Sequence, residues 1–189
     1  MSIEGEDSMS EPSGPQWCSR FPGGVSPNDL LPEFRDRVLA FISALERGGA
    51  KVSISATYRP PERAYLMHWC CMIADSGQDP AAVPPMSGVD IDWSHNGDVS
   101  DARSAAAAMK SAYEIKFPAA LVSRHTQRRA IDMTISWQGT LEVIDFNGQK
   151  RVVTMPPRSG LNQAIVDVGR SFGVIKLMTD PPHWSDDGH

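Results

Sequence analysis

Apolar residues in the first half of the chain recur at the spacing of a helix face. One amphipathic helix is predicted before the glycine pair at 48–49, from the positions of Leu31, Phe34, Val38, Phe41 and Leu45. The next segment, 51–59, alternates between apolar and polar residues and predicts a strand. Pro60 and Pro61 can begin a second helix that Gly77 ends. That helix is apolar on most sides, so we expect it to lie at the centre of the fold.

The middle of the chain combines a loop pattern with a helix pattern. Residues 77–97 are rich in proline and glycine and contain one short extended piece, VDIDW, which is typical of a long loop that shapes a cleft. The segment 100–115 predicts a third helix with Ser100 as its cap. Its run of alanines favours close packing against a neighbouring element.

Strand patterns dominate the second half of the chain. Three strands are predicted, at 129–137, 141–146 and 150–155. Asn147–Gly148 is a tight-turn signal between the last two, so we expect an antiparallel meander. A helix over 161–172 and a strand over 174–178 follow. Helices thus precede strands, which indicates an α+β fold in which helices pack on one face of an antiparallel sheet.

Length and composition indicate one folded domain. A chain of 189 residues is long enough for one sizeable core. Residues 1–25 are rich in Ser, Glu, Pro and Gly, and we expect them to form a flexible arm ahead of a domain at 26–189. The chain has three cysteines, an odd number, at positions without the spacing of metal ligands: Cys18, Cys70 and Cys71. We therefore predict neither a disulfide framework nor a thiolate metal site.

Charge and the start of the chain limit the expected partners. The formal net charge is −5 and the charges alternate rather than cluster, which argues against nucleic-acid binding. Apolar runs are too short for a membrane span, so we expect no membrane insertion. The first residues are acidic and polar where a secretory signal needs a basic stretch and an apolar run. We therefore expect synthesis in the cytoplasm without a Sec signal.

Three side chains in the second half of the chain are candidate zinc ligands. A hydrolytic zinc site takes three His or carboxylate ligands and leaves a fourth position for water. His125 and Asp132 lie seven residues apart. If Ile131 and Met133 face the core, Asp132 faces the opposite side of its strand. His183, which follows two prolines that stiffen the chain, would be the third ligand.

Asp180 lies three residues before His183 and is the candidate acid/base. A carboxylate at that spacing can lie beside a metal rather than on it. There it can take the proton of an attacking water and return it to the leaving amine. Zinc lowers the pKa of a bound water to about 7, so an ordinary carboxylate is a sufficient base.

Two short motifs resemble those of a known family. SRHTQRRAID, at 123–132, matches the S-x-H-x4-A-x-D pattern of zinc D-alanyl-D-alanine carboxypeptidases, vancomycin-resistance D-Ala-D-Ala dipeptidases and phage L-alanyl-D-glutamate endolysins. DPPHW, at 180–184, is similar to their second signature, an acidic residue three before a histidine. The resemblance implies that the three candidate ligands bind Zn²⁺ and that Asp180 is catalytic. It also implies the small α+β fold shared with hedgehog signalling domains.

The resemblance also suggests residues on the substrate side. The family has an arginine after the first strand in a Y-R stretch, here Tyr58–Arg59, so Arg59 would bind the scissile carbonyl or the oxyanion, unless it is an ion-pair anchor. Ser123 is expected either to contact substrate or to cap a turn. Tyr58 and Trp184 are candidate substrate contacts, with core packing as the alternative for Trp184. Arg128 stands where the family has glycine, and the glutamine that often follows the Y-R pair is not evident.

These patterns predict a zinc-dependent peptidoglycan peptidase, an endopeptidase or carboxypeptidase that hydrolyses a stem-peptide bond involving D-amino acids. Without a Sec signal, it would act on the wall in the periplasm either as a phage endolysin released through a holin or as an injected antibacterial effector. An effector would need a secretion-system carrier, and its producer an immunity protein. Two alternatives stay open: a cytoplasmic D-Ala-D-Ala dipeptidase and a non-catalytic, metal-containing binding module.

Overall fold

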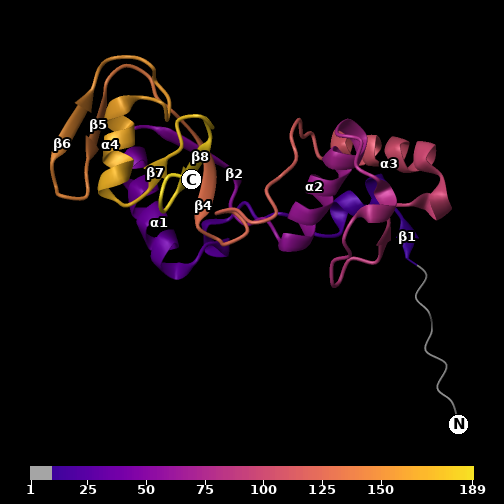
Figure 1. Ribbon diagram of the computed structural model, residues 1–189. Helices are drawn as coiled ribbons and strands as arrows, with labels where there is room; N and C mark the ends of the chain where they lie inside the picture. Colours follow the sequence, from indigo (N-terminus) through magenta and orange to yellow (C-terminus); the bar gives the residue numbers. More distant parts are fainter. Residues whose placement is uncertain (1–9) are drawn as a thin grey trace, which may run out of the picture. The chain divides into compact units, whose positions relative to one another are not determined.

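The computed structural model describes residues 10–189, which form two compact units (Figure 1). We call residues 10–22 and 60–122 the helical unit, and residues 23–59 and 123–189 the sheet unit. Each unit has its own hydrophobic core. The chain combines α-helices with antiparallel sheets, so the expected α+β class is confirmed. It divides into two units, however, where a single domain at 26–189 was expected.

In the helical unit, two helices pack against each other. The helix α2 (Pro61–Asp75) and the helix α3 (Val99–Ala112) share a core that contains Leu66, Ile73 and Met109. The carboxylate of Asp98 accepts a hydrogen bond from a first-turn N–H of α3, so the cap is Asp98 rather than the expected Ser100. Along residues 10–189, no helix is both long and apolar enough to cross a membrane.

The segment expected to be a flexible arm belongs in large part to the helical unit. Its residues 1–9 lie outside the described residues. The short strand β1 (Glu11–Pro12) pairs in parallel with β3 (Ile91–Asp92), within the expected loop. Trp17 is 2% exposed in the core and its indole N–H donates to the Pro12 carbonyl. Burial of this aromatic side chain explains why the segment packs although its composition is polar.

The sheet unit contains two antiparallel sheets and two α-helices, which are labelled in Figure 1. The larger sheet has the strand order β2-β4-β8-β7, with bounds Lys51–Ala56, Ala130–Ser136, His183–Ser185 and Ile175–Lys176. The smaller sheet pairs β5 (Leu141–Ile144) with β6 (Lys150–Val153). The helices are α1 (Pro32–Arg47) and α4 (Gln163–Ser171).

The expected three-stranded meander is wrong in one respect. The β5–β6 hairpin forms as predicted, with Gly148 at a φ of 77° in its turn and the Asp145 carboxylate accepting from the N–H groups of Asn147 and Gln149. However, β4 does not pair with β5, because both edges of β4 are occupied by β2 and β8. The segment 183–185, which the sequence did not mark as a strand, takes the place expected for β5.

The two faces of strand β4 differ, since one faces the hydrophobic core and the other is polar. Ile131, Met133 and Ile135 are buried and share one hydrophobic cluster with residues of α1 and α4. Asp132 and Thr134 alternate with them and therefore point to the other face, as the sequence pattern predicts. The polar face of β4 is where the candidate site lies.

Candidate metal centre

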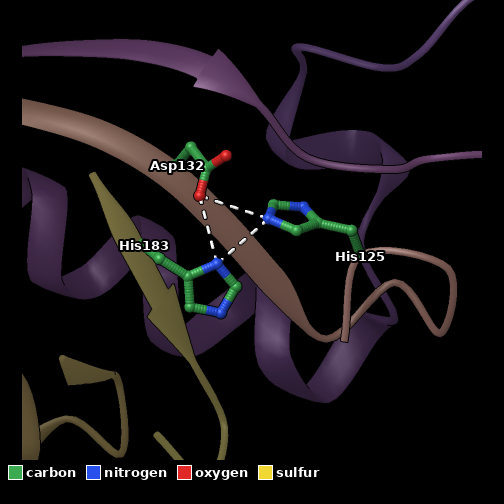
Figure 2. A group of neighbouring side chains, drawn as sticks. All are labelled: His125, Asp132 and His183. Atoms are coloured by element: carbon green, nitrogen blue, oxygen red, sulfur yellow. Dashed lines mark hydrogen bonds and ion pairs between the residues drawn. The ribbon is translucent and has the colours of Figure 1, made fainter. Parts of the chain in front are cut away.

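His125, Asp132 and His183 converge on one point of the sheet unit (Figure 2). Asp132 lies on β4 directly opposite His183 on β8, so their side chains leave the sheet on the same face. His125 reaches them from the turn that precedes β4. His125 Nε2 is 3.1 Å from His183 Nδ1 and 3.2 Å from Asp132 Oδ1, and His183 Nδ1 is 3.2 Å from Asp132 Oδ1.

A compact turn presents His125 to the other two residues. The Ser123 hydroxyl accepts a hydrogen bond from the Thr126 N–H, and the Thr126 hydroxyl donates to the Ser123 carbonyl at 2.8 Å. Ser123 therefore caps the turn that holds His125, which is one of the two roles expected for it. Its predicted contact with substrate stays a prediction.

Main-chain carbonyls orient both imidazole rings. His125 Nδ1 lies 2.7 Å from the Thr57 carbonyl oxygen, and His183 Nε2 lies 3.1 Å from the His189 carbonyl oxygen. A carbonyl oxygen only accepts, so these two nitrogens must carry the protons. In the neutral rings, the inward nitrogens then bear lone pairs. When both rings are neutral, two lone pairs and a carboxylate oxygen thus face one another with no proton between them.

This donor set fits a small divalent cation. Imidazole nitrogen and carboxylate oxygen are the ligands that catalytic zinc sites use. Ligands at about 2.0 Å from a tetrahedral zinc are roughly 3.3 Å apart, close to the observed separations of 3.1 and 3.2 Å. A bound cation would also remove the repulsion among the three electron-pair donors. The cluster could therefore hold a metal ion.

The same contacts shift the pKa values of the metal-free group. Burial acts to raise the pKa of Asp132, but hydrogen bonds from His125 and His183 outweigh burial and lower that pKa far below its usual range. Burial acts to lower the pKa of His183, but the Asp132 carboxylate and the His189 carbonyl outweigh it and raise that pKa. In the metal-free protein, a proton on His183 would therefore take the place that a cation can occupy.

The Thr57 carbonyl that orients His125 is itself held in place. Thr57 is fully buried, its N–H donates to the Gly24 carbonyl at 2.8 Å, and its hydroxyl donates to the Asp29 carboxylate at 3.1 Å. The Arg59 N–H, two residues further on, donates to the His125 carbonyl at 3.2 Å. The end of β2 and the His125 turn are thus joined by hydrogen bonds on both sides of the ring.

Ion pairs fix the turn that contains the His189 carbonyl. Arg124 pairs with Asp187, and its Nε lies 3.6 Å from Asp186; Arg129 pairs with Asp186 at 2.7 Å. Asp187 also accepts from the His189 N–H at 3.1 Å. Sequence reasoning missed this network. Complementary charges at 124–129 and 186–187 were a signal for it, although charge alone does not say which pairs form.

Sequence reasoning also missed Lys176, which holds the loop before His183. Lys176 is 5% exposed, and its ammonium donates to the carbonyls of Leu177, Asp180 and His183 at 2.6, 2.5 and 3.0 Å. Burial lowers the pKa of Lys176, against the effect of nearby carboxylates. A buried ammonium with three carbonyl acceptors fixes the path of the loop that leads to the candidate ligand His183. A single lysine in a short strand gave no sign of this role.

The predicted acid/base, Asp180, is not one of the three members of the metal group, which we define as His125, Asp132 and His183. It is exposed, and its negative charge acts to raise the pKa values of both His183 and Lys176. Its carbonyl accepts from the His183 N–H at 3.1 Å, in a tight turn. Its predicted acid/base role stays a prediction.

Tyr58 and Arg128 form a stacked pair near the His125 turn. The Arg128 guanidinium lies over the Tyr58 ring at 4.4 Å from its centroid. Arg128 has a φ of 60°, in the left-handed region that favours glycine. Glycine would therefore adopt the backbone conformation at position 128 with less strain than arginine does. The predicted substrate contact of Tyr58 stays a prediction.

The prediction that Trp184 contacts substrate is wrong. Its side chain is 0% exposed and packs against Phe41, with ring centroids 5.3 Å apart. Because side chains alternate along a strand, Trp184 must point away from the face that its neighbour His183 occupies. The alternative that the sequence left open, core packing, is the correct one.

No model of a known protein family matches this chain, and no curated protein is significantly similar to it in sequence. The function must therefore be inferred from the site itself and from the two short motifs.

Proposed function

We propose that this chain is a zinc-dependent peptidase that cleaves a bond involving D-amino acids in the stem peptides of bacterial peptidoglycan. The observation that carries the proposal is the convergence of two imidazole nitrogens and one carboxylate oxygen at 3.1–3.2 Å. Within residues 10–189 the group has three protein members, which is the number that catalytic zinc sites use. A structural zinc site would take four.

The choice of substrate rests on the motifs. The S-x-H-x4-A-x-D pattern at 123–132 and the acidic residue three before His183 resemble those of zinc D-Ala-D-Ala peptidases and phage endolysins. The site geometry supports the resemblance, since His125, Asp132 and His183, which come from both motifs, meet in space. We propose on the same grounds that the sheet unit has the fold shared with hedgehog signalling domains.

Each proposed catalytic role belongs to a residue near the metal group. A bound zinc ion would supply Lewis acidity and lower the pKa of a water molecule to about 7. The exposed Asp180 carboxylate would take the proton from the attacking water and pass it to the leaving amine nitrogen. The Arg59 guanidinium would bind the scissile carbonyl oxygen, and the Arg59 N–H already joins this residue to the His125 turn at 3.2 Å.

The proposed substrate lies outside the compartment in which the chain is made. We propose that the protein acts on the wall either as a phage endolysin or as an injected antibacterial effector. An effector would need a secretion-system carrier and a matching immunity protein. Co-expression with an immunity partner from the same operon should separate the two, because an endolysin needs no such partner.

Two variants test the proposed chemistry. Digestion of purified sacculi by the zinc-loaded protein should release new muropeptides, identified by mass spectrometry. Asp180→Ala should retain one zinc per chain and lose hydrolysis by about 10²–10⁴-fold. His183→Ala should lose both zinc and hydrolysis. Asp167→Ala, which removes an exposed carboxylate on α4, is the matched control and should change neither.

Other outcomes would select the alternatives. Hydrolysis of free D-Ala-D-Ala with no release from sacculi would indicate a cytoplasmic dipeptidase. Zinc binding without hydrolysis of either substrate would contradict the peptidase proposal and indicate a metal-containing binding module. Full activity in Asp180→Ala would rule out its acid/base role.

A further inference from the structure

An open pocket of about 390 Å³ lies in the sheet unit next to the metal group. Its volume is within the range of about 300–1,000 Å³ that is usual for ligand sites. Side chains from four segments line it: Ser55 of β2, Thr134 of β4, Ser159 and Leu161 of the loop before α4, and Pro181 and Pro182 of the loop before β8. None of these residues was singled out by sequence reasoning as a substrate contact.

Residues that line the pocket are close neighbours of two members of the metal group, Asp132 and His183. Thr134 lies two residues after Asp132 on β4, so both side chains point to the same face of the sheet. Pro182 directly precedes His183. The Ser55 hydroxyl donates to the Asp132 carbonyl at 3.3 Å, which joins the β2 side of the pocket to the same ligand. A molecule in the pocket would therefore lie beside two of the three metal-ligating residues.

Two prolines keep the pocket open. The Met133 N–H donates to the Pro182 carbonyl at 2.9 Å, which extends the β4–β8 pairing by one residue. Pro182 has no N–H, so it cannot return a hydrogen bond to the Met133 carbonyl, and Pro181 cannot continue the ladder. Pairing resumes only at the isolated bridge between Ser136 and Ser159. Between these points, one edge of β4 faces the pocket.

The pocket lining carries no charged side chain. The side chains of Met133 and Ile135 are each 1% exposed in the core, so these two residues contribute main chain to the pocket. The remaining lining offers hydroxyl groups and small apolar surfaces. Peptide groups can form hydrogen bonds with strand-edge main chain and hydroxyls, whereas an ionised side chain would lose water and meet no partner of opposite charge.

We propose that this pocket binds an extended peptide segment with small, uncharged side chains adjacent to the bond that is cut. The inference rests on the proposed peptidase function and adds the part of the substrate that the sheet unit recognises. The peptide would lie along β4 beyond Asp132, with Thr134 and Ser159 beside it. Charged residues of the substrate would lie outside this segment.

The test measures binding directly, so that it does not depend on hydrolysis. Zinc-loaded, ¹⁵N-labelled full-length protein is titrated with acetylated, amidated tetra-alanine in the D and L forms, and with the same peptides carrying one glutamate or one lysine. The neutral peptide should shift the amide signals of Thr134 and of 159–161. Either charged peptide should bind about tenfold more weakly.

A variant that introduces a charge into the pocket distinguishes a change in peptide recognition from a general loss of structure. Thr134→Arg places a guanidinium on an exposed position of the pocket; it should weaken binding of the neutral peptide about tenfold and reverse the preference in favour of the glutamate peptide. Thr134→Val removes the hydroxyl and keeps the shape, and should weaken binding by a smaller factor. Val152→Arg, at an exposed strand position on β6, is the matched control and should bind all peptides normally.

The results distinguish failure of this inference from failure of the proposed function. If the neutral peptide shifts no amide of the pocket, or if Thr134→Arg has the peptide preferences of the unaltered protein, the pocket does not bind substrate, even if sacculi are digested. If the peptide binds in the pocket with the expected preferences and sacculi are not digested, the pocket is a peptide-binding site, and it is the peptidase proposal that fails.

Discussion

The two faces of the β4–β8 strand pair have opposite chemistry. One face carries Ile131 and Trp184, both 0% exposed and packed in the hydrophobic core. The other face carries Asp132 and His183, whose donor atoms lie 3.2 Å apart. These residues are neighbours in sequence, so a step of one residue along either strand moves from core to site.

The comparison shows how a small sheet can support a costly polar cluster. Burial of a carboxylate and two imidazoles disfavours folding unless the groups have partners. The core face supplies packing energy on the same strands, and main-chain carbonyls and Lys176 fix the polar face. We therefore expect substitutions on the core face to change stability, and substitutions on the site face to change metal binding.

Trp184→Ala should have the largest effect on stability. Removal of this indole leaves a cavity beside Phe41 and should reduce the free energy of unfolding by about 3–5 kcal/mol. Urea denaturation of the metal-free protein measures this change. Zinc stoichiometry of the remaining folded protein should stay at one per chain. A loss of stability below about 1 kcal/mol would contradict the assignment of Trp184 to the core.

Asp132→Ala should have a large effect on zinc affinity and a small effect on stability. It removes one of three ligands, so zinc affinity should fall by more than about 100-fold, beyond the usual effect of residues that only orient ligands. The free energy of unfolding of the metal-free protein should change much less than in Trp184→Ala, since a buried charge is removed with its hydrogen bonds. Competition with a chromophoric chelator measures the affinity. Ser136→Ala, on the same face of β4, should bind zinc normally.

Lys176→Met should weaken metal binding only because it changes the position of His183. Methionine fills a similar volume but cannot donate to the three carbonyls of the loop before His183. We expect zinc affinity to fall about 10–100-fold, as for other residues that orient ligands, with an altered visible spectrum of the Co²⁺ form. Lys150→Met removes an exposed lysine paired with Glu142 and is the control. Unchanged affinity and spectrum would show that Lys176 does not position His183.

The smallest effect is a dependence of melting temperature on pH. The lowered pKa of Asp132 stabilises the fold above its unfolded pKa of about 4, and the raised pKa of His183 stabilises it below its unfolded pKa of about 6.5. As pH rises through the raised pKa of His183, the metal-free protein loses that contribution. Zinc needs the deprotonated ring, so the stabilisation by zinc should grow over the same interval.

Thermal unfolding with zinc and with chelator, between pH 5.5 and pH 8, tests this dependence. The difference in melting temperature between the two forms should increase steadily with pH. A constant difference would indicate that His183 does not exchange a proton for the metal.

The sequence predicts local structure better than it predicts pairing. The helices α1 and α2 and the alternation of β4 follow from residue patterns, because each pattern reflects burial of one face. The partners of β4 do not follow, because a strand pattern does not say which strand lies beside it. The error at Trp184 has the same origin: 183–185 was not recognised as a strand, so alternation was not applied there.

The three candidate ligands were found from residue type and motif, but the groups that orient them were not. The rings of His125 and His183 are held by the carbonyls of Thr57 and His189. Every residue has a carbonyl, so residue type says nothing about such a role. The division into two units was also missed, since a chain of this length usually has one core.

The left-handed backbone at Arg128 has a consequence for engineering of the protein. An arginine in this conformation costs about 1–2 kcal/mol relative to glycine, while glycine would add freedom to the unfolded chain and partly offset the gain. Replacement of Arg128 by glycine would thus raise thermal stability and remove one positive surface charge. A stabilised variant made there would lose the guanidinium above Tyr58, so heat resistance and the electrostatic field beside the site cannot be adjusted independently at this residue.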